Sequence, residues 1–407
     1  MSSSVPRRLL GVLAALSLGV LAACGSSSGG GTGTSGDIVI GVNNSDEGNG
    51  QDLAYFGDAV QAWANDLNRR GGIDGRSIRI ERCNDQASEQ GATFCTRQQV
   101  QNSEIVAALG YSPLAGTIQG PTYSRAGVPF MQLGARDRYS IDGTGSVLTV
   151  DPQTIGAFGG GLAQTISGTL GKKKIAVIRL DAASLDFSFS LVKQSFEATG
   201  AEIVADIKHP ATTVDFTASV VQAKAAGADA VIGLQTTPGY IRLLQAAAAQ
   251  DFRVPFGAAG PTLTPDLEKA VADTGATMVL NAFAADPVHS TDPDLVAFRD
   301  AMTASNFSAD IPKAGSVGAW GAAKVLESAL TTIGGDAISR DAVLKALTDD
   351  TFSDVPLFDG QVGRANGTPE MPALGYTKTY MVTLDGTGAR YTPEPIDIRP
   401  TLERIKS

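Results

Sequence analysis

The sequence predicts an α/β protein of two similar halves, each a parallel sheet flanked by helices. Short buried-strand patterns alternate with amphipathic helix patterns from residue 37 to residue 258. The strand, helix and strand expected within 37–85 form a βαβ unit, which requires parallel pairing. The tripeptide Val-Pro-Phe at 128–130 returns at 254–256, in a similar place in each half. No period of 20 to 50 residues recurs more than twice, so a short-repeat solenoid is not expected.

The first half begins with the strand pattern Asp-Ile-Val-Ile-Gly-Val at 37–42. A helix follows, because Phe56, Val60 and Trp63 recur at the three- and four-residue steps of one helix face. The glycine pair at 71–72 predicts its end. Further strands are expected at 76–85, 103–110 and 127–133, with a helix at 113–126.

The second half repeats this alternation, and a different tail follows it. Strands are expected at 173–180, 201–207, 228–234 and 253–258. Helices are expected between them at 186–199, 214–226 and 237–250. In the tail, helices at 294–304, 315–333 and 340–348 precede a hairpin at 376–391, in which Asp385 and Gly386 supply turn chemistry.

The first residues predict an export signal. Arg7 and Arg8 precede an uncharged apolar run at 9–23, which is the pattern of a secretory signal. The run is too short for a comfortable membrane span, which needs roughly 20 residues. We therefore expect residues 1–23 to be a signal peptide that is removed on export.

A lone cysteine follows this signal. The tetrapeptide Leu-Ala-Ala-Cys at 21–24 resembles a bacterial lipobox, in which the cysteine sulfur receives a diacylglycerol and the chain is cut just before it. Residues 25–36 are only Gly, Ser and Thr, a composition typical of a flexible tether. We expect a lipid on Cys24 and a linker over 24–36; an ordinary cleaved signal without a lipid is the alternative.

Charge and cysteine count limit the partners. The formal net charge is −10 and the basic block is confined to 172–174, so nucleic acid is not expected as a partner. In an exported chain, the two remaining cysteines, Cys83 and Cys95, predict one disulfide. A metal or redox pair is the alternative reading of these cysteines. The chain has only two histidines, which argues against a His-based metal site.

The loops after the strands are the expected place for a ligand. In open α/β sheets, ligands bind outside the carboxyl ends of the strands. If the halves face each other, these loops line one cleft. They are 43–50, 110–117 and 133–138 in the first half, and 181–188, 234–239 and 258–263 in the second.

The order of these segments resembles the extracytoplasmic solute-binding proteins of ABC importers, and most of all the leucine/isoleucine/valine-binding protein family. The resemblance covers nearly all of residues 37–395. Its most specific part is Asn-x-x-Gly-Gly-Ile-x-Gly-Arg at 68–76. It is also carried by the segments at 55–85, 103–113, 126–135 and 173–181.

The resemblance implies the type 1 periplasmic binding protein fold, with two Rossmann-like lobes of parallel sheet joined by three crossovers. Residues 37–150 and 285–350 would form lobe 1, and residues 151–284 and 351–400 would form lobe 2. The long helix of the tail would then return to the first lobe. A monomer without a cofactor is the family expectation.

Function in this family is capture without chemistry. The lobes close on a small solute, and a membrane permease reads the closed form. The solute shifts the equilibrium by its preference for the closed state. The lipid would hold the protein at the outer face of the bacterial cell membrane, near its ABC permease.

In amino-acid-binding members, a Ser and a Thr of the first lobe bind the solute carboxylate. This sequence retains Ser112 and Thr117 in the matching loop. The next loop lacks the family's Thr and has Ala135 and Arg136 in that turn. Arg136 would suit a bidentate bond to a carboxylate, or else pair with Asp137.

The second lobe departs further from the family pattern. Ala259 stands where an acidic residue usually holds the ammonium, and Gln235 stands where an aromatic residue is common. Gln235 suits an amide, hydroxyl or carbonyl, or forms a hydrogen bond at the lobe surface. Asp181 would replace the missing anion, or cap its own turn. The working hypothesis is a small polar solute with a carboxylate or amide, such as a branched-chain amino acid or a related compound.

Other classes of protein fit less well. The Gly-rich segment 156–164 lacks the dinucleotide-binding spacing directly after a strand. The segment 143–146 does not form a Gly-x-Ser-x-Gly elbow, and both histidines lie in loop-like segments. We therefore do not expect an enzyme. A ligand-sensing lipoprotein of the same fold, signalling to a membrane receptor, remains the alternative.

Overall fold

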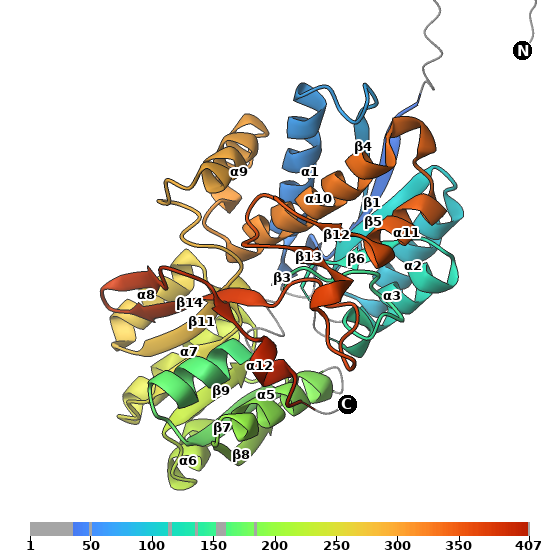
Figure 1. Ribbon diagram of the computed structural model, residues 1–407. Helices are drawn as coiled ribbons and strands as arrows, with labels where there is room; N and C mark the ends of the chain where they lie inside the picture. The colour runs from blue at the N-terminus through green and yellow to red at the C-terminus, as the bar shows by residue number, and fades with distance from the viewer. Residues whose placement is uncertain are drawn as a thin grey trace, which may run out of the picture. The chain divides into compact units, whose positions relative to one another are not determined.

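The computed structural model describes residues 36–48, 51–112, 116–134, 137–151, 160–182 and 185–405 (Figure 1). The expected signal peptide and Cys24 lie outside the described residues. Ala135 and Arg136 lie outside them as well.

The first sheet is parallel and four-stranded, in the order β4-β1-β5-β6. Its strands are β1 (Ile38–Asn44), β4 (Ile78–Asn84), β5 (Ile105–Tyr111) and β6 (Phe130–Gln132). Helices α1 (Ala54–Arg69), α2 (Glu89–Gln101) and α3 (Gly116–Arg125) connect them. The βαβ order expected for the first half is confirmed.

The motif at 68–76 joins the end of α1 to β4. The Asn68 side chain donates to the Ile78 carbonyl at 2.8 Å and accepts from the Ile78 N–H at 2.7 Å. Gly72 has a φ of +70°, and an added Cβ would lie 2.0 Å from the Arg76 carbonyl oxygen. Only glycine fits this turn, because both the positive φ and the close backbone exclude a side chain.

The second sheet is larger, with the order β15-β14-β11-β10-β9-β7-β8. Its parallel strands are β7 (Lys174–Leu180), β8 (Glu202–His209), β9 (Ala230–Leu234), β10 (Pro255–Ala258) and β11 (Thr277–Ala282). The expected hairpin is present as β14 (Lys378–Asp385) and β15 (Gly388–Tyr391), antiparallel to β11. The helices of this sheet are α5 (Asp186–Ala198), α6 (Thr217–Ala225), α7 (Thr237–Ala249) and α8 (Pro265–Thr274).

The chain passes between the two sheets three times: from β6 to β7, after β11, and into β14. Between the last two passages lie α9 (Pro293–Ala304), α10 (Ala314–Ile333) and α11 (Arg340–Asp349). Helix α10 packs beside α1 (Figure 1). Trp320 shares one core with Trp63 and Ile38. The long helix thus returns to the first sheet, as expected.

The segment between α11 and β14 belongs to the same core. It contains the short strands β12 (Thr351–Phe352) and β13 (Val362–Gly363), which pair with each other. Phe352, Val355 and Tyr376 are buried in the core of the first sheet. The expected division assigned residues 351–400 to lobe 2. Within that range these three side chains pack with the first sheet, whereas Val382 and Leu384 of β14 pack with the second.

A disulfide ties β4 to α2. Cys83 and Cys95 are bonded, with their Cα atoms 5.6 Å apart. This confirms the predicted pairing. In the chain-entropy model, closing a loop of this length stabilises the fold by about 3 kcal/mol.

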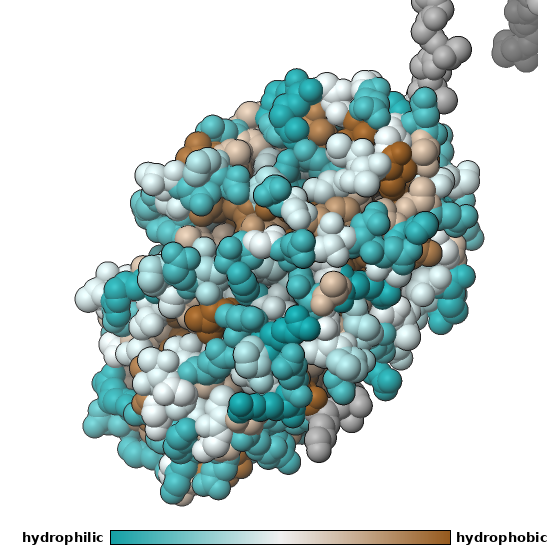
Figure 2. Space-filling view, in the orientation of Figure 1, coloured by the Kyte–Doolittle hydropathy of each residue, from teal (hydrophilic) through white to brown (hydrophobic). Residues whose placement is uncertain are grey.

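The face drawn in Figure 2 is mostly hydrophilic, with apolar residues scattered among polar ones. Among the described residues, Val214 and Phe94 are the most exposed of the large apolar side chains. Within the same part of the chain, no helix combines the length and apolarity needed to cross a bilayer.

Candidate functional site

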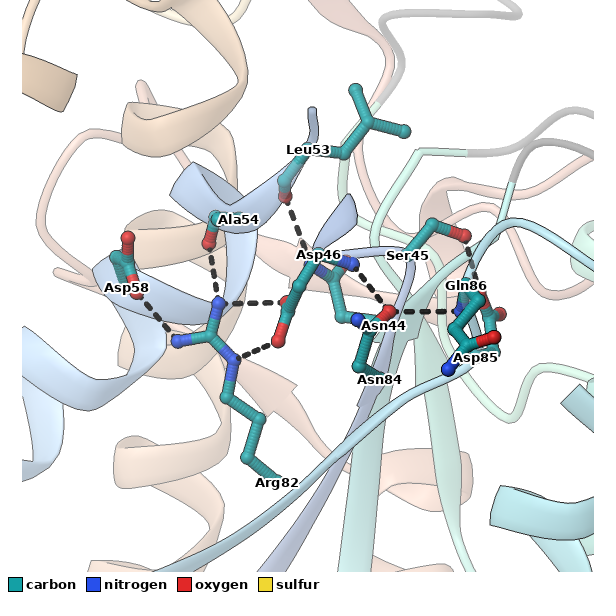
Figure 3. A network of polar contacts seen from close by, with 10 residues as sticks. All are labelled: Asn44, Ser45, Asp46, Leu53, Ala54, Asp58, Arg82, Asn84, Asp85 and Gln86. Atoms are coloured by element: carbon teal, nitrogen blue, oxygen red, sulfur yellow. Dashed lines mark hydrogen bonds and ion pairs between the residues drawn. The ribbon is translucent and has the colours of Figure 1, made fainter. Parts of the chain in front are cut away.

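Three polar side chains stand directly after three strands of the first sheet. Ser45 follows β1, Asp85 follows β4 and Ser112 follows β5, and all three are buried. The Ser45 hydroxyl donates to the Asp85 carboxylate at 2.6 Å (Figure 3), and the hydroxyl oxygens of Ser45 and Ser112 lie 3.3 Å apart. Gln119 of α3 donates to the other oxygen of Asp85 at 3.3 Å. We call these four residues the Asp85 cluster.

The Asp85 cluster holds a carboxylate in a buried place. Burial raises the pKa of Asp85 above its ordinary value, although hydrogen bonds from Ser45, Ser112 and the Ala87 N–H oppose the shift. The amide oxygen of Gln119 is also buried and has no hydrogen-bond partner in the described part of the chain. The cluster is therefore rich in acceptors, and Ser112 is already one of its donors.

A second pair lies at the end of β6. Gln132 donates from its amide nitrogen to Asp137 at 3.0 Å, and Asp137 also accepts from the Ser140 N–H at the start of the short helix η1 (Arg138–Ser140). Burial raises the pKa of Asp137. The amide oxygen of Gln132 is buried without a partner among the described residues. This edge of the sheet thus offers a second unpaired acceptor.

An ion-pair network fixes the loop that enters α1. The Arg82 guanidinium contacts both carboxylate oxygens of Asp46, at 2.8 and 2.7 Å, and also pairs with Asp58 of α1 (Figure 3). Asn44 donates to Asp46 and to the Leu53 carbonyl, each at 2.8 Å. Bidentate Arg–carboxylate bonds hold a defined geometry. They position this loop next to Ser45.

At the corresponding edge of the second sheet, Gln235 directly follows β9. Its amide nitrogen lies 3.0 Å from the Ile178 carbonyl oxygen and 2.6 Å from the His209 ring nitrogen Nε2. The Asp181 carboxylate, 64% exposed, pairs loosely with Lys208 at 3.6 Å. Ala259 is buried and its carbonyl accepts from the Thr262 hydroxyl at 2.6 Å.

The sequence-predicted residues thus occupy different surroundings. Ser112 is buried within the Asp85 cluster, whereas Thr117 is exposed in the first turn of α3. Ala135 and Arg136 cannot be placed because they lie outside the described residues.

Several residues of both edges were not foreseen, namely Ser45, Asp85, Gln119, Gln132 and His209. Ser112 was named from the family resemblance, whereas Ser45 and Asp85 are marked by their place as the first residues after β1 and β4. His209 was expected in a loop, but it is the last residue of β8. Gln119 and Gln132 carry no sequence signal of their own. In the described residues, no group of three or more His, Cys, Asp or Glu side chains is arranged to hold a metal ion.

A family model described as periplasmic binding protein matches residues 37–388. The chain belongs to the periplasmic binding protein family. Its structural relatives are substrate-binding proteins of ABC transporters with the type 1 fold, so the expected fold class is confirmed. Among curated proteins, none matches the sequence.

Three solved structures illustrate this relation. An ABC transporter substrate-binding protein from Sphaerobacter thermophilus has a TM-score of 0.73 and 20% identity, with 90% of this chain and 100% of that chain covered. The branched-chain amino acid binding protein LivJ from Streptococcus pneumoniae, in complex with isoleucine, has a TM-score of 0.68 and 19% identity, covering 89% and 100%. A solute-binding protein from R. palustris, in complex with benzoate, has a TM-score of 0.66 and 18% identity, covering 89% and 98%.

Proposed function

We propose that this periplasmic binding protein is tethered to the membrane and captures a small polar solute in a cleft between its lobes, for delivery to an ABC permease without catalysis. The observation that carries the proposal is the placement of polar side chains directly after strands of both sheets. Ser45, Asp85 and Ser112 follow strands of the first, and Gln235 follows a strand of the second. That edge is where open α/β sheets bind ligands.

The solute class follows from the balance of donors and acceptors. Gln119 and Gln132 each have a buried amide oxygen without a partner in the described part of the chain. A buried acceptor that stays unpaired costs free energy, so a solute with N–H or O–H groups is favoured. The buried Asp85 carboxylate disfavours a second carboxylate beside it. We therefore favour an amino acid or an amide over a simple carboxylic acid.

A solute carboxylate would then bind away from Asp85. Thr117, the turn at Ala135 and the guanidinium of Arg136 are the proposed partners for it. On the second lobe, Gln235 would bind the polar end of the solute, with Asp181 near the mouth of the cleft and Ala259 leaving room. The proposed lobes are 37–150 with 285–350, and 151–284 with 351–400, except that Phe352, Val355 and Tyr376 pack with the first of them. The two lobes would close as a monomer.

The tether is proposed from residues 1–36. Removal of 1–23 and acylation of Cys24 would keep the folded part at the outer face of the cell membrane. Cys24→Ser should move the protein from the membrane fraction to the soluble fraction, with its binding activity unchanged. Equal membrane retention of the variant and the wild type would exclude the lipid anchor.

The solute class is tested by thermal stabilisation of the mature chain carrying Cys24→Ser. The probes are L-leucine, L-leucinamide and 4-methylpentanoate, which share one side chain and differ in their donors. A bound solute stabilises by about 2.7 kcal/mol at one hundred times its dissociation constant. We expect a shift with leucine or leucinamide and none with 4-methylpentanoate. A shift with 4-methylpentanoate alone would contradict the donor argument, and no shift with these probes or with a wider set of amides, aromatic acids and sugars would contradict solute capture.

A further inference from the structure

Two groups of the second sheet fix the carboxamide of Gln235. The single amide nitrogen of Gln235 lies 3.0 Å from the Ile178 carbonyl oxygen and 2.6 Å from His209 Nε2. A carbonyl oxygen only accepts, so the carboxamide must turn its nitrogen, and not its oxygen, to this side. Both hydrogens of that nitrogen are then used, and His209 Nε2 must act as an acceptor.

The other ring nitrogen of His209 supports the same assignment. Nδ1 lies 2.9 Å from the Pro210 carbonyl oxygen, which again only accepts, so Nδ1 carries the hydrogen. His209 is 6% exposed, and its ring packs edge-on against Phe216, with the ring centroids 4.7 Å apart. These contacts fit one state of the imidazole: neutral, with its hydrogen on Nδ1.

We infer that His209 is a positioning residue, which holds Gln235 so that only its amide oxygen is offered to a solute. This inference rests on the proposed function, because it assigns Gln235 to the solute site. The amide oxygen makes no hydrogen bond within the described part of the chain. It lies beside Gly239 in the first turn of α7, where an added Cβ would stand 3.0 Å away. The second lobe therefore recognises a hydrogen-bond donor of the solute, in agreement with the unpaired acceptors of the first.

The arrangement also makes capture sensitive to pH. A proton on His209 Nε2 would place one N–H against another, which would expel the carboxamide of Gln235. Solute affinity is therefore expected to fall when the pH is lowered far enough to protonate His209.

Among the described residues, no charged side chain bonds to the His209 imidazole in the way that Gln235 does. In the described residues, no ion pair or hydrogen bond joins the His209 ring to a charged side chain of β8 or of the elements packed against it. Those side chains are Lys174, Arg179 and Asp181 from β7 and its following turn, Asp186, Lys193 and Glu197 from α5, Asp215 and Lys224 at α6, and Glu202, Asp206 and Lys208 on β8 itself.

The hydrogen bond between His209 and Gln235 is tested first without any solute, by nitrogen NMR of the imidazole rings and the glutamine carboxamides. The chain has two histidines, so the variant His209→Gln identifies the His209 signals. We expect the tautomer with hydrogen on Nδ1 at neutral pH, and carboxamide signals of Gln235 that shift in step with protonation of His209. A hydrogen on Nε2, or Gln235 signals indifferent to that protonation, would overturn the inference whether or not a solute is known.

The second arm measures the dissociation constant from pH 8 to pH 5 for the probe, L-leucine or L-leucinamide, that stabilises the mature chain. His209→Gln keeps an acceptor near the Nε2 position and cannot take up a proton, so it should match wild type at pH 8 and lose the pH dependence. His209→Phe should weaken binding at least tenfold at pH 8. His289→Gln, which removes the other histidine, is the control and should behave as wild type. If His209→Gln keeps the wild-type pH dependence, His209 is not the positioning residue.

Discussion

Replacing Asp85 separates the two roles of its carboxylate, which accepts several hydrogen bonds and also carries a buried charge. It accepts from the Ser45 hydroxyl at 2.6 Å, from the Ala87 N–H at 2.9 Å and from the Gln119 amide at 3.3 Å. Asp85→Ala removes both roles. Asp85→Asn removes the charge and keeps most of the hydrogen bonding.

Asp85→Ala leaves these donors without their acceptor. Each buried donor that loses its partner costs about 1–3 kcal/mol. Ser45 and Ser112 can bond to each other across their 3.3 Å separation, which recovers part of the loss. We expect the free energy of unfolding at pH 7 to fall by about 3–5 kcal/mol.

In Asp85→Asn, the Gln119 side chain can compensate for the lost acceptor oxygen. The new amide group would face Gln119, and the Gln119 carboxamide can turn over to offer the oxygen that is unpaired in the wild type. The substitution also removes the cost of burying a charge. The free energy of unfolding at pH 7 should therefore stay within about 1 kcal/mol of wild type.

The pH dependence of stability distinguishes the two proteins further. Burial raises the folded-state pKa of Asp85 above 3.8, so the folded state binds this proton more tightly than the unfolded state. Between 3.8 and the raised value, this group makes the wild type less stable as the pH rises and more stable as it falls. Asp85→Asn lacks this contribution, and Asp137 is common to both proteins. The wild type should therefore gain stability relative to Asp85→Asn as the pH is lowered from 7 towards 4.

The assay is urea denaturation followed by circular dichroism at pH 7, 5.5 and 4.5, for the wild type and both variants. A loss in Asp85→Asn as large as that in Asp85→Ala would refute the compensation by Gln119. A difference between the wild type and Asp85→Asn that does not change with pH would refute the burial argument.

Two further changes test the fold around this site. Gly72→Ala should lower the free energy of unfolding by more than 2 kcal/mol, since the backbone cost of about 1–2 kcal/mol is added to a Cβ placed 2.0 Å from the Arg76 carbonyl oxygen. The control is Gly71→Ala, which also has a positive φ, +104°, but no atom within 4 Å of its Cβ, and urea denaturation should show the smaller loss. Replacing Cys83 and Cys95 together by serine should cost about 3 kcal/mol in the same assay, and equal stability in the presence and absence of reductant would contradict a stabilising role for the disulfide.

Much of the fold follows from periodicity in the sequence. The steps between Phe56, Val60 and Trp63 predicted α1, and all three side chains are buried. The glycine pair at 71–72 predicted the end of this helix, and Asn68 and Gly72 join that end to β4 by local hydrogen bonds and close backbone packing. Such features can be predicted from the sequence because they depend on residues close together in the chain.

The strands and the packing of the segment 351–376 could not be predicted in this way. Its strands β12 and β13 have two residues each, which is too short for a period. The core of the first sheet places its Phe352 and Val355, whereas its Met371 and Leu374 pack in a separate cluster with Ile141. Assignment of this segment therefore needs tertiary contacts.

The candidate site was predictable only where strand ends decide it. Ser112 was predicted from the family resemblance, and it stands directly after β5. Gln119 and Gln132 take their roles from partners on other elements, Asp85 and Asp137, so no local pattern marks them. His209 was missed because β8 runs two residues beyond its predicted end and brings the ring to Gln235.

The central claim is that a solute binds at the carboxyl ends of the strands of both sheets. The most direct measurement is calorimetric titration of the stabilising probe into wild type, Gln235→Ala, Gln119→Ala and Gln222→Ala, the last an exposed residue of α6. We predict at least tenfold weaker binding for Gln235→Ala and Gln119→Ala, with Gln222→Ala unchanged. Wild-type affinity in both Gln235→Ala and Gln119→Ala would contradict the claim.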